Sequence, residues 1–210
     1  MVFAVEKMMR DVRIAIDENR TSEQLVSDDD IDTLALDELI SSKIEEAARK
    51  VIASAPIMLL DGGRPVGDAL YWRGDGVGWV LLPDDFLRLV VFKMSDWERP
   101  VHTVVAPGTP TYQLQFSRCK GLRGNPQKPI VALTRRAEGL ALEFFSCCTE
   151  SAVIEMGSYI PLPRIRDGYV NLPERCYKAV VYETASLVLV AMGQGELASF
   201  MSNIAKELMV

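Results

Sequence analysis

The sequence offers few side chains of the kind that catalyse reactions. It has 210 residues but a single histidine, His102, and imidazole is the usual general base and a common metal ligand. His102 stands beside Val101 and Val104, with no further ligand type nearby. We therefore predict no enzymatic activity, no catalytic residue, and no bound metal or cofactor.

One pair of adjacent carboxylates could perform acid–base or metal chemistry. Asp84 and Asp85 follow Leu-Leu-Pro83, and two neighbouring carboxylates can share a proton or a cation. Proline and aspartate are also the residues that set tight turns. We predict a turn between two strands at this position.

The cysteines show no C-x-x-C spacing. Cys147 and Cys148 follow two phenylalanines in an apolar run, and neighbouring residues of a strand face opposite sides, so the pair cannot easily share one metal. We predict that all four cysteines are reduced and that this pair is buried as small apolar side chains.

Two glycine-containing motifs resemble known binding motifs but are better explained as turns or loops. Arg73-Gly74-Asp75 spells an integrin-recognition tripeptide, but Gly74 and Gly76 predict a turn with positive φ. Residues 121–128 contain glycines and bases that could cradle phosphate. They lack the Gly-Lys-Ser/Thr ending of a P-loop, so we predict a long hairpin or arm.

Charge is distributed unevenly along the chain. Residues 1–50 hold 13 acids and 7 bases and so carry the whole net charge of −6, whereas the remaining 160 residues balance at 16 and 16. Residues 99–137 contain seven bases and no acid. The molecule therefore has an acidic end and a basic middle.

The basic stretch has three readings. It can be a solvated loop, a surface that docks on an acidic protein such as the helical end of a neighbouring subunit, or a nucleic-acid contact. The negative overall charge and the few aromatic residues expected at its surface argue against nucleic acid. The candidate partner-binding residues are Arg99, Arg118, Lys120, Arg123, Lys128, Arg135 and Arg136.

The N-terminal region predicts two helices. Apolar residues recur at steps of three and four over 2–18, at positions Val2, Val5, Met9, Val12 and Ile16. A polar loop over 19–30 follows, and its aspartates 28–30 can cap a second helix over 31–54. Pro56 ends that helix.

The C-terminal region also predicts two helices. Asn171-Leu-Pro-Glu174 is a typical helix start. Residues 179–192 are apolar on nearly all sides, which predicts a helix at the centre of a bundle. Gly193 and Gly195 separate it from a last helix whose apolar side comprises Leu197, Phe200, Met201, Ile204 and Leu208.

Between these ends the chain has short apolar runs separated by Gly, Pro and Asp. They predict strands at 68–72, 77–82, 86–93, 111–117, 130–134, 139–146 and 152–160. The clearest alternation is at 111–117, where Tyr112, Leu114 and Phe116 alternate with polar residues.

These elements predict an α+β protein. The N- and C-terminal helices, 1–56 and 171–210, form a helical bundle. Residues 57–170 form an inserted small antiparallel β-sandwich or barrel with a basic arm around 99–137. No charge-free run of about 18 apolar residues exists, and charged residues interrupt the N-terminus. We expect no membrane span, no targeting segment and an intracellular chain.

The order of these elements resembles that of phage head-to-tail connector proteins of the podovirus adaptor, or tail tubular protein A-like, group. The resemblance rests on Tyr71-Trp72, on the run from Trp79 to Arg88 that contains Leu-Pro-Asp-Asp-Phe-Leu-Arg, and on the helix from Leu172 to Ala185. The acidic first pair of helices departs from the family pattern.

The resemblance implies a structural virion protein without catalysis or cofactor, assembled in the host cytoplasm. It implies a ring, commonly of twelve copies, that docks between the portal and tail proteins, with DNA passing through the lumen without sequence-specific binding. The alternative is a cytoplasmic accessory protein that binds a ligand or nucleic acid.

Overall fold

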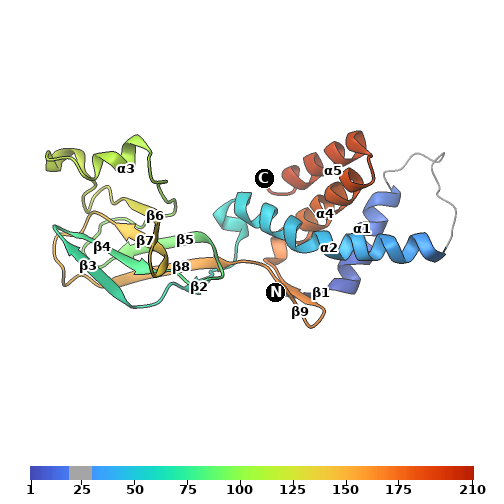
Figure 1. The fold of residues 1–210 in the computed structure, drawn as a ribbon, viewed down its shortest axis with the longest axis horizontal. Coiled ribbons are helices and arrows are strands. Elements are labelled where there is room, and N and C mark those ends of the chain that lie inside the picture. Colours follow the sequence, from blue (N-terminus) through green and yellow to red (C-terminus); the bar gives the residue numbers. More distant parts are fainter. Residues whose placement is uncertain (19–29) are drawn as a thin grey trace. The chain divides into compact units, whose positions relative to one another are not determined.

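The computed structural model describes residues 1–18 and 30–210 and shows an α+β protein, which confirms the predicted class (Figure 1). Two compact units make up the chain. The helical unit comprises Met1–Asp61 and Leu162–Val210, and the β unit comprises Gly62–Pro161. The chain thus leaves the helical unit once and returns to it.

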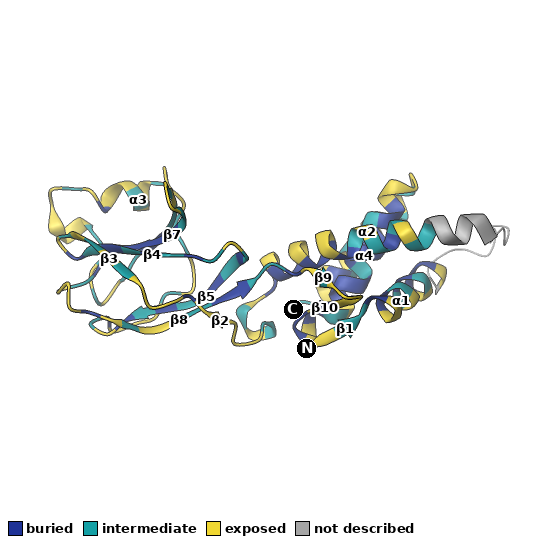
Figure 2. Ribbon diagram, turned by 60° about the horizontal axis from the view of Figure 1, so that its bottom comes forward, coloured by how far each residue is buried: buried dark blue, intermediate teal, exposed yellow. Residues whose placement is uncertain are grey.

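The helical unit is organised around helix α4, which contacts the three other long helices. These helices are α1 (Val5–Glu18), α2 (Asp30–Ser54), α4 (Tyr177–Ala191) and α5 (Gly195–Glu207). Val180, Ala185 and Leu189 of α4 are fully buried. Figure 2 shows the ribbon of the unit coloured by burial. The helix is buried on most sides because its sequence is apolar on most sides, as predicted.

The N-terminus differs from the prediction. Residues Val2–Ala4 form strand β1 and only then does α1 begin; Met8 rather than Met9 is completely buried, and Val2 is exposed. Strand β1 pairs with β10 (Tyr169–Asn171), which pairs with β9 (Ile165–Arg166). The first residues leave the helical pattern because this pairing satisfies their backbone groups.

The same pairing displaces the predicted start of α4. Asn171 belongs to β10 and does not cap a helix. A 3₁₀ turn, Glu174–Cys176, follows, and α4 begins at Tyr177. At the other end, Gly193 adopts a φ of 78° after α4, as the predicted break requires. The polar loop over 19–30 and its capping aspartates fall outside the described residues.

The β unit contains two sheets, and six of the seven predicted strands are confirmed. One sheet has the order β2-β8-β5 and the other β3-β4-β7-β6. The strands are β2 (Arg64–Pro65), β3 (Leu70–Gly74), β4 (Val77–Leu81), β5 (Phe86–Met94), β6 (Val131–Arg136), β7 (Gly139–Phe144) and β8 (Ile154–Pro161).

Both sheets contribute to one core, with Phe92 and Tyr159 from the first and Val80, Leu142 and Phe144 from the second. Over the described residues neither sheet closes on itself, so the barrel alternative is wrong.

The strand predicted at 111–117 is wrong. Pro110–Leu114 is a one-turn helix, α3, and the Thr109 hydroxyl accepts a hydrogen bond from the Tyr112 backbone N–H at 3.3 Å. Proline occupies the first helical position, where its missing N–H costs nothing. The expected burial of alternate apolar residues is absent, because Gln115 is buried while Leu114 and Phe116 are exposed.

Both predicted turns are confirmed. Gly74, Asp75 and Gly76 all have positive φ between β3 and β4. Before β5, the Phe86 N–H donates to the carbonyl of Pro83 at 3.0 Å. Asp85 in this second turn accepts hydrogen bonds from the Arg64 guanidinium (2.9 Å) and the Tyr159 hydroxyl (2.7 Å). Its carboxylate therefore has a structural role.

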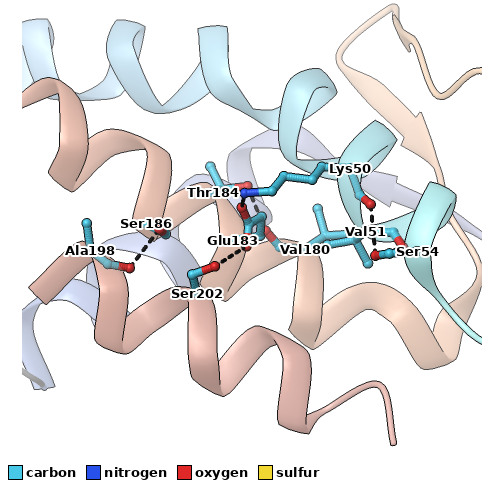
Figure 3. A network of polar contacts seen from close by, with 9 residues as sticks. All are labelled: Lys50, Val51, Ser54, Val180, Glu183, Thr184, Ser186, Ala198 and Ser202. Carbon is cyan, nitrogen blue, oxygen red and sulfur yellow. Dashed lines mark hydrogen bonds and ion pairs between the residues drawn. The ribbon is translucent and has the colours of Figure 1, made fainter. Parts of the chain in front are cut away.

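A buried carboxylate ties three helices of the helical unit together (Figure 3). Glu183 of α4 is 3% exposed; it pairs with Lys50 of α2 and accepts a hydrogen bond from Ser202 of α5 at 3.2 Å. One turn away, the Ser186 hydroxyl donates to the carbonyl of Ala198 at 2.7 Å. Burying a charge is tolerated only with such partners.

We predict that Leu189→Asp unfolds the helical unit. Leu189 is fully buried, and an unpaired buried carboxylate costs roughly 4 kcal/mol, a large part of a domain's stability. Circular dichroism melting and soluble yield measure the effect. Val190→Asp is the matched control, since the neighbouring Val190 is 60% exposed. Equal behaviour of the two variants would contradict the central position of α4.

Candidate interaction surface

The outer face of the β3-β4-β7-β6 sheet carries a buried glutamate. The strand register places Tyr71, Trp79, Glu143 and Ala132 directly across from one another. Glu143 is 2% exposed, so its charge must be neutralised by groups that fold over the sheet.

Two side chains neutralise Glu143. The Arg136 Nη2 donates to Oε1 at 3.1 Å, and the Tyr112 hydroxyl donates to Oε2 at 3.2 Å. Burial and, next, the Glu143 charge raise the pKa of Tyr112, so it remains protonated as a donor. The Arg136 guanidinium also lies 3.7 Å from the centre of the Trp79 ring, a cation–π contact.

The hydrogen bond from the Tyr112 hydroxyl to Glu143 holds α3 against the sheet. Tyr112, Phe116 and Phe145 form three edge-to-face contacts with ring centres 5.2–5.8 Å apart. Val105 pairs with Ala132 of β6 as a parallel bridge. Residues 105–116 therefore pack against the sheet.

A second anchor lies at the β3–β4 turn. Asp75 pairs with Lys120 (3.0 Å) and Arg123 (2.7 Å), and these hydrogen bonds hold the pKa of Asp75 below its usual value. The Nε of Arg123 also donates to the carbonyl of Ser117 at 2.6 Å. These two candidate bases therefore fasten the loop to its own unit.

The stretch is more tightly anchored than the predicted arm. Residues Lys120–Leu122 form a 3₁₀ turn, and the Lys128 N–H donates to the carbonyl of Asn125 at 2.9 Å. The segment 121–128 is a series of short turns and not a long hairpin.

The seven candidate bases do not form one cluster. Arg136 lies on Glu143, while its neighbour Arg135 points to the other face of β6. The segments that carry Arg99 and Lys128 are joined by a backbone hydrogen bond, in which the Glu98 N–H donates to the carbonyl of Pro126 at 2.9 Å. Among the described residues, Arg99, Arg118, Lys128 and Arg135 have no carboxylate partner.

Exposed apolar side chains accompany these bases, which the sequence reasoning missed. Leu114, Phe116 and Leu122 are 42%, 48% and 55% exposed. The Arg73 guanidinium lies 5.9 Å from the Phe116 ring centre. We call the exposed side chains Arg73, Leu114, Phe116, Arg118 and Leu122 the docking patch. The Thr-Pro pair at 109–110 was the signal that could have revealed it, because it predicts a helix start.

The cysteines are only partly as predicted. All four are free, but Cys148 and Cys119 are exposed, Cys147 is half-buried and only Cys176 is buried. Strand β7 ends at Phe144, before the Cys147–Cys148 pair, so strand alternation does not govern them. Burial and then Asp96 raise the pKa of Cys147 to about 12.

The remaining candidates for chemistry are His102 and groups of metal-ligating side chains. His102 is exposed, and its Nδ1 lies 2.8 Å from the carbonyl oxygen of Val90. Over residues 1–18 and 30–210 no cluster of three metal-ligating side chains occurs, and no helix in that part has the length and apolarity to span a membrane.

No protein-family model matches the sequence, and neither does any curated protein.

We predict that Glu143→Gln loosens the segment over the sheet. Arg136 is only 26% exposed and would lose its carboxylate, which should lower the free energy of unfolding by about 2 kcal/mol. Urea unfolding and hydrogen exchange of residues 105–124 measure the effect. Glu138→Gln, at an exposed position in the β6–β7 turn, is the control. Identical exchange in both variants would argue against the anchoring role.

We predict two classes of thiol. Cys119 and Cys148 should react rapidly with a maleimide at pH 8, because both are exposed. Cys147 should react slowly, since its raised pKa suppresses the thiolate, and burial should protect Cys176. Mass spectrometry counts the modified thiols over time. Rapid labelling of all four in the native protein would disprove the observed burial.

Proposed function

We propose that this chain is a structural subunit of a phage virion, a head-to-tail connector that assembles as a ring between portal and tail proteins without catalysis. The observation that carries the proposal is the docking patch, whose exposed apolar side chains Leu114, Phe116 and Leu122 belong to the anchored loop, with the Arg73 guanidinium over the Phe116 ring. Arginine and aromatic residues of this kind are enriched in protein interfaces.

The division of charge between the units supports assembly of like copies. The helical unit carries 12 bases and 19 acids, and the β unit 11 and 10. The helical unit therefore carries a net charge of −7 and the β unit +1. This difference favours contacts between unlike surfaces. Such a contact closes as a ring when the rotation between copies permits.

We propose that α1, α2, α4 and α5 form one bundle from the two chain ends and that the β unit is a sandwich inserted between them. The short segments that resemble connector proteins lie in β3, at the turn between β4 and β5, and in α4, which are parts of the folded core of each unit. The ring would enclose the DNA and be assembled in the host cytoplasm.

A nucleic-acid-binding accessory protein is the second candidate. The exposed Tyr71 ring stacks on Trp79 with centres 5.6 Å apart, and Arg73 lies above Phe116. Flat side chains of this kind can stack with bases. Three of the bases are already paired with Asp75 and Glu143, however, which leaves less positive charge for phosphates.

We predict that the combined change Arg99→Glu, Arg118→Glu and Lys128→Glu blocks incorporation into particles and leaves the fold intact. All three residues are exposed and lack a carboxylate partner among the described residues. Electron microscopy of particles assembled with the variant measures incorporation, and a melting curve measures stability. Lys120 and Arg123 are left unchanged because they fasten the loop to Asp75.

A control with the same change of charge comes from the helical unit: Arg164→Glu, Arg166→Glu and Lys178→Glu, all at exposed positions. This variant should assemble normally. Wild-type incorporation of the first variant would contradict a docking role for the basic stretch, as would equal loss of incorporation in both variants.

A further inference from the structure

Helix α5 has an exposed face whose chemistry is complementary to the docking patch. Its buried side consists of Ala198, Met201 and Ala205. Glu196, Phe200, Asn203 and Glu207 are all exposed, and their spacing of four, three and four residues places them along one side of the helix. We call these four residues the α5 face.

The α5 face combines an apolar centre with acidic ends. Phe200 is 51% exposed, and Glu196 and Glu207 lie on either side of it, about 16 Å apart at 1.5 Å per residue. Within the described residues no base pairs with either glutamate. An exposed phenylalanine between unpaired carboxylates suits a partner with apolar side chains and arginines.

We propose that the α5 face of one copy docks on the docking patch of a second copy. Phe200 would pack on Phe116 and Leu122, and Glu196 and Glu207 would approach Arg73 and Arg118. The contact joins two different surfaces of the same chain, so one copy of a joined pair retains a free docking patch and the other a free α5 face, and the assembly continues head to tail. This inference rests on the proposed function and names the surfaces that build the ring.

The two surfaces complement each other in both charge and hydrophobicity. The patch belongs largely to a stretch without a single acid from 99 to 137, and the only acids of α5 are the two glutamates of the face. A second copy is favoured over nucleic acid because a polyanion would satisfy the arginines but would leave Leu114 and Leu122 without apolar partners. It would also leave the α5 face without a role.

Cys119 provides a native reporter for the contact. It is exposed and stands between Arg118 and Lys120, within the segment that carries the patch. The test introduces Asn203→Cys on the α5 face together with Cys148→Ser, which removes the other exposed thiol. Mild oxidation should then join the introduced thiol of one copy to Cys119 of the next and give a ladder of dimers, trimers and larger chains on a non-reducing gel. Peptide mass spectrometry identifies the linked pair.

The matched control is Ser42→Cys in the same Cys148→Ser background. Ser42 is exposed but lies on α2 and not on the α5 face. This variant should therefore form no ladder. Equal cross-linking of the two variants, or a disulfide that does not include Cys119, would overturn the proposal. A dimer without larger products would overturn its head-to-tail geometry.

A charge exchange tests the same contact without a covalent bond. Wild-type chains should associate at low salt, as measured by sedimentation velocity. Glu196→Arg with Glu207→Arg, or Arg73→Glu with Arg118→Glu, should each abolish this association. The four changes combined in one chain should restore it, because the charges are then exchanged between the two surfaces. Failure of the combined variant to recover association, with its melting curve unchanged, would contradict the pairing.

The remaining outcomes separate this contact from the proposed function. If the α5 changes leave association intact while the basic-stretch variant still fails to enter particles, the chain remains a candidate connector and this pairing is wrong. If a single-stranded oligonucleotide protects Cys119 of the wild-type chain from maleimide and the Asn203→Cys chain forms no ladder, the patch binds nucleic acid and both the pairing and the ring contact are overturned.

Discussion

One buried glutamate in each unit determines which segments pack there. A carboxylate taken out of water needs a base or several donors beside it. Glu183 draws Lys50 from α2 and Ser202 from α5 onto α4, so the helices of the two chain ends are fixed in one register. Glu143 does the same for the β unit through Arg136 and Tyr112. Apolar burial supplies most of the stability, and these two groups limit the arrangements in which it can be achieved.

This use of charge explains why the basic stretch is not simply a basic surface. Arg136 forms an ion pair with Glu143, and Lys120 and Arg123 form ion pairs with Asp75. What remains for a partner is a smaller set of exposed bases, together with apolar side chains that the loop turns outward. Counting charges along the sequence therefore overestimates the electrostatic part of the surface and omits its apolar part, which is the part that gives most affinity in protein interfaces.

The sequence was informative where periodicity extends over many residues. The run 179–192 and six of the strands follow from repeated burial on one side or on all sides, and local exceptions average out. The sequence pattern gave a wrong prediction where a few residues determine the local structure. The alternation at 111–117 is strand-like, but Thr109 and Pro110 start a helical turn and a hydrogen bond from Tyr112 to Glu143 holds it. That partner lies 31 residues away, so no local pattern contains it.

The anchors of the loop also bear on what the docking patch can do. A flexible arm would lose conformational entropy on binding, and this loss would reduce the affinity gained from a few exposed side chains. The loop here is fixed at three points before any partner arrives: Val105 on Ala132, Tyr112 on Glu143, and Arg123 on Asp75. Phe116 is further held by Phe145 and Arg73. A patch of moderate size would therefore suffice for the contact between copies that we propose, because a closed ring would repeat that contact around its circumference and leave no free end.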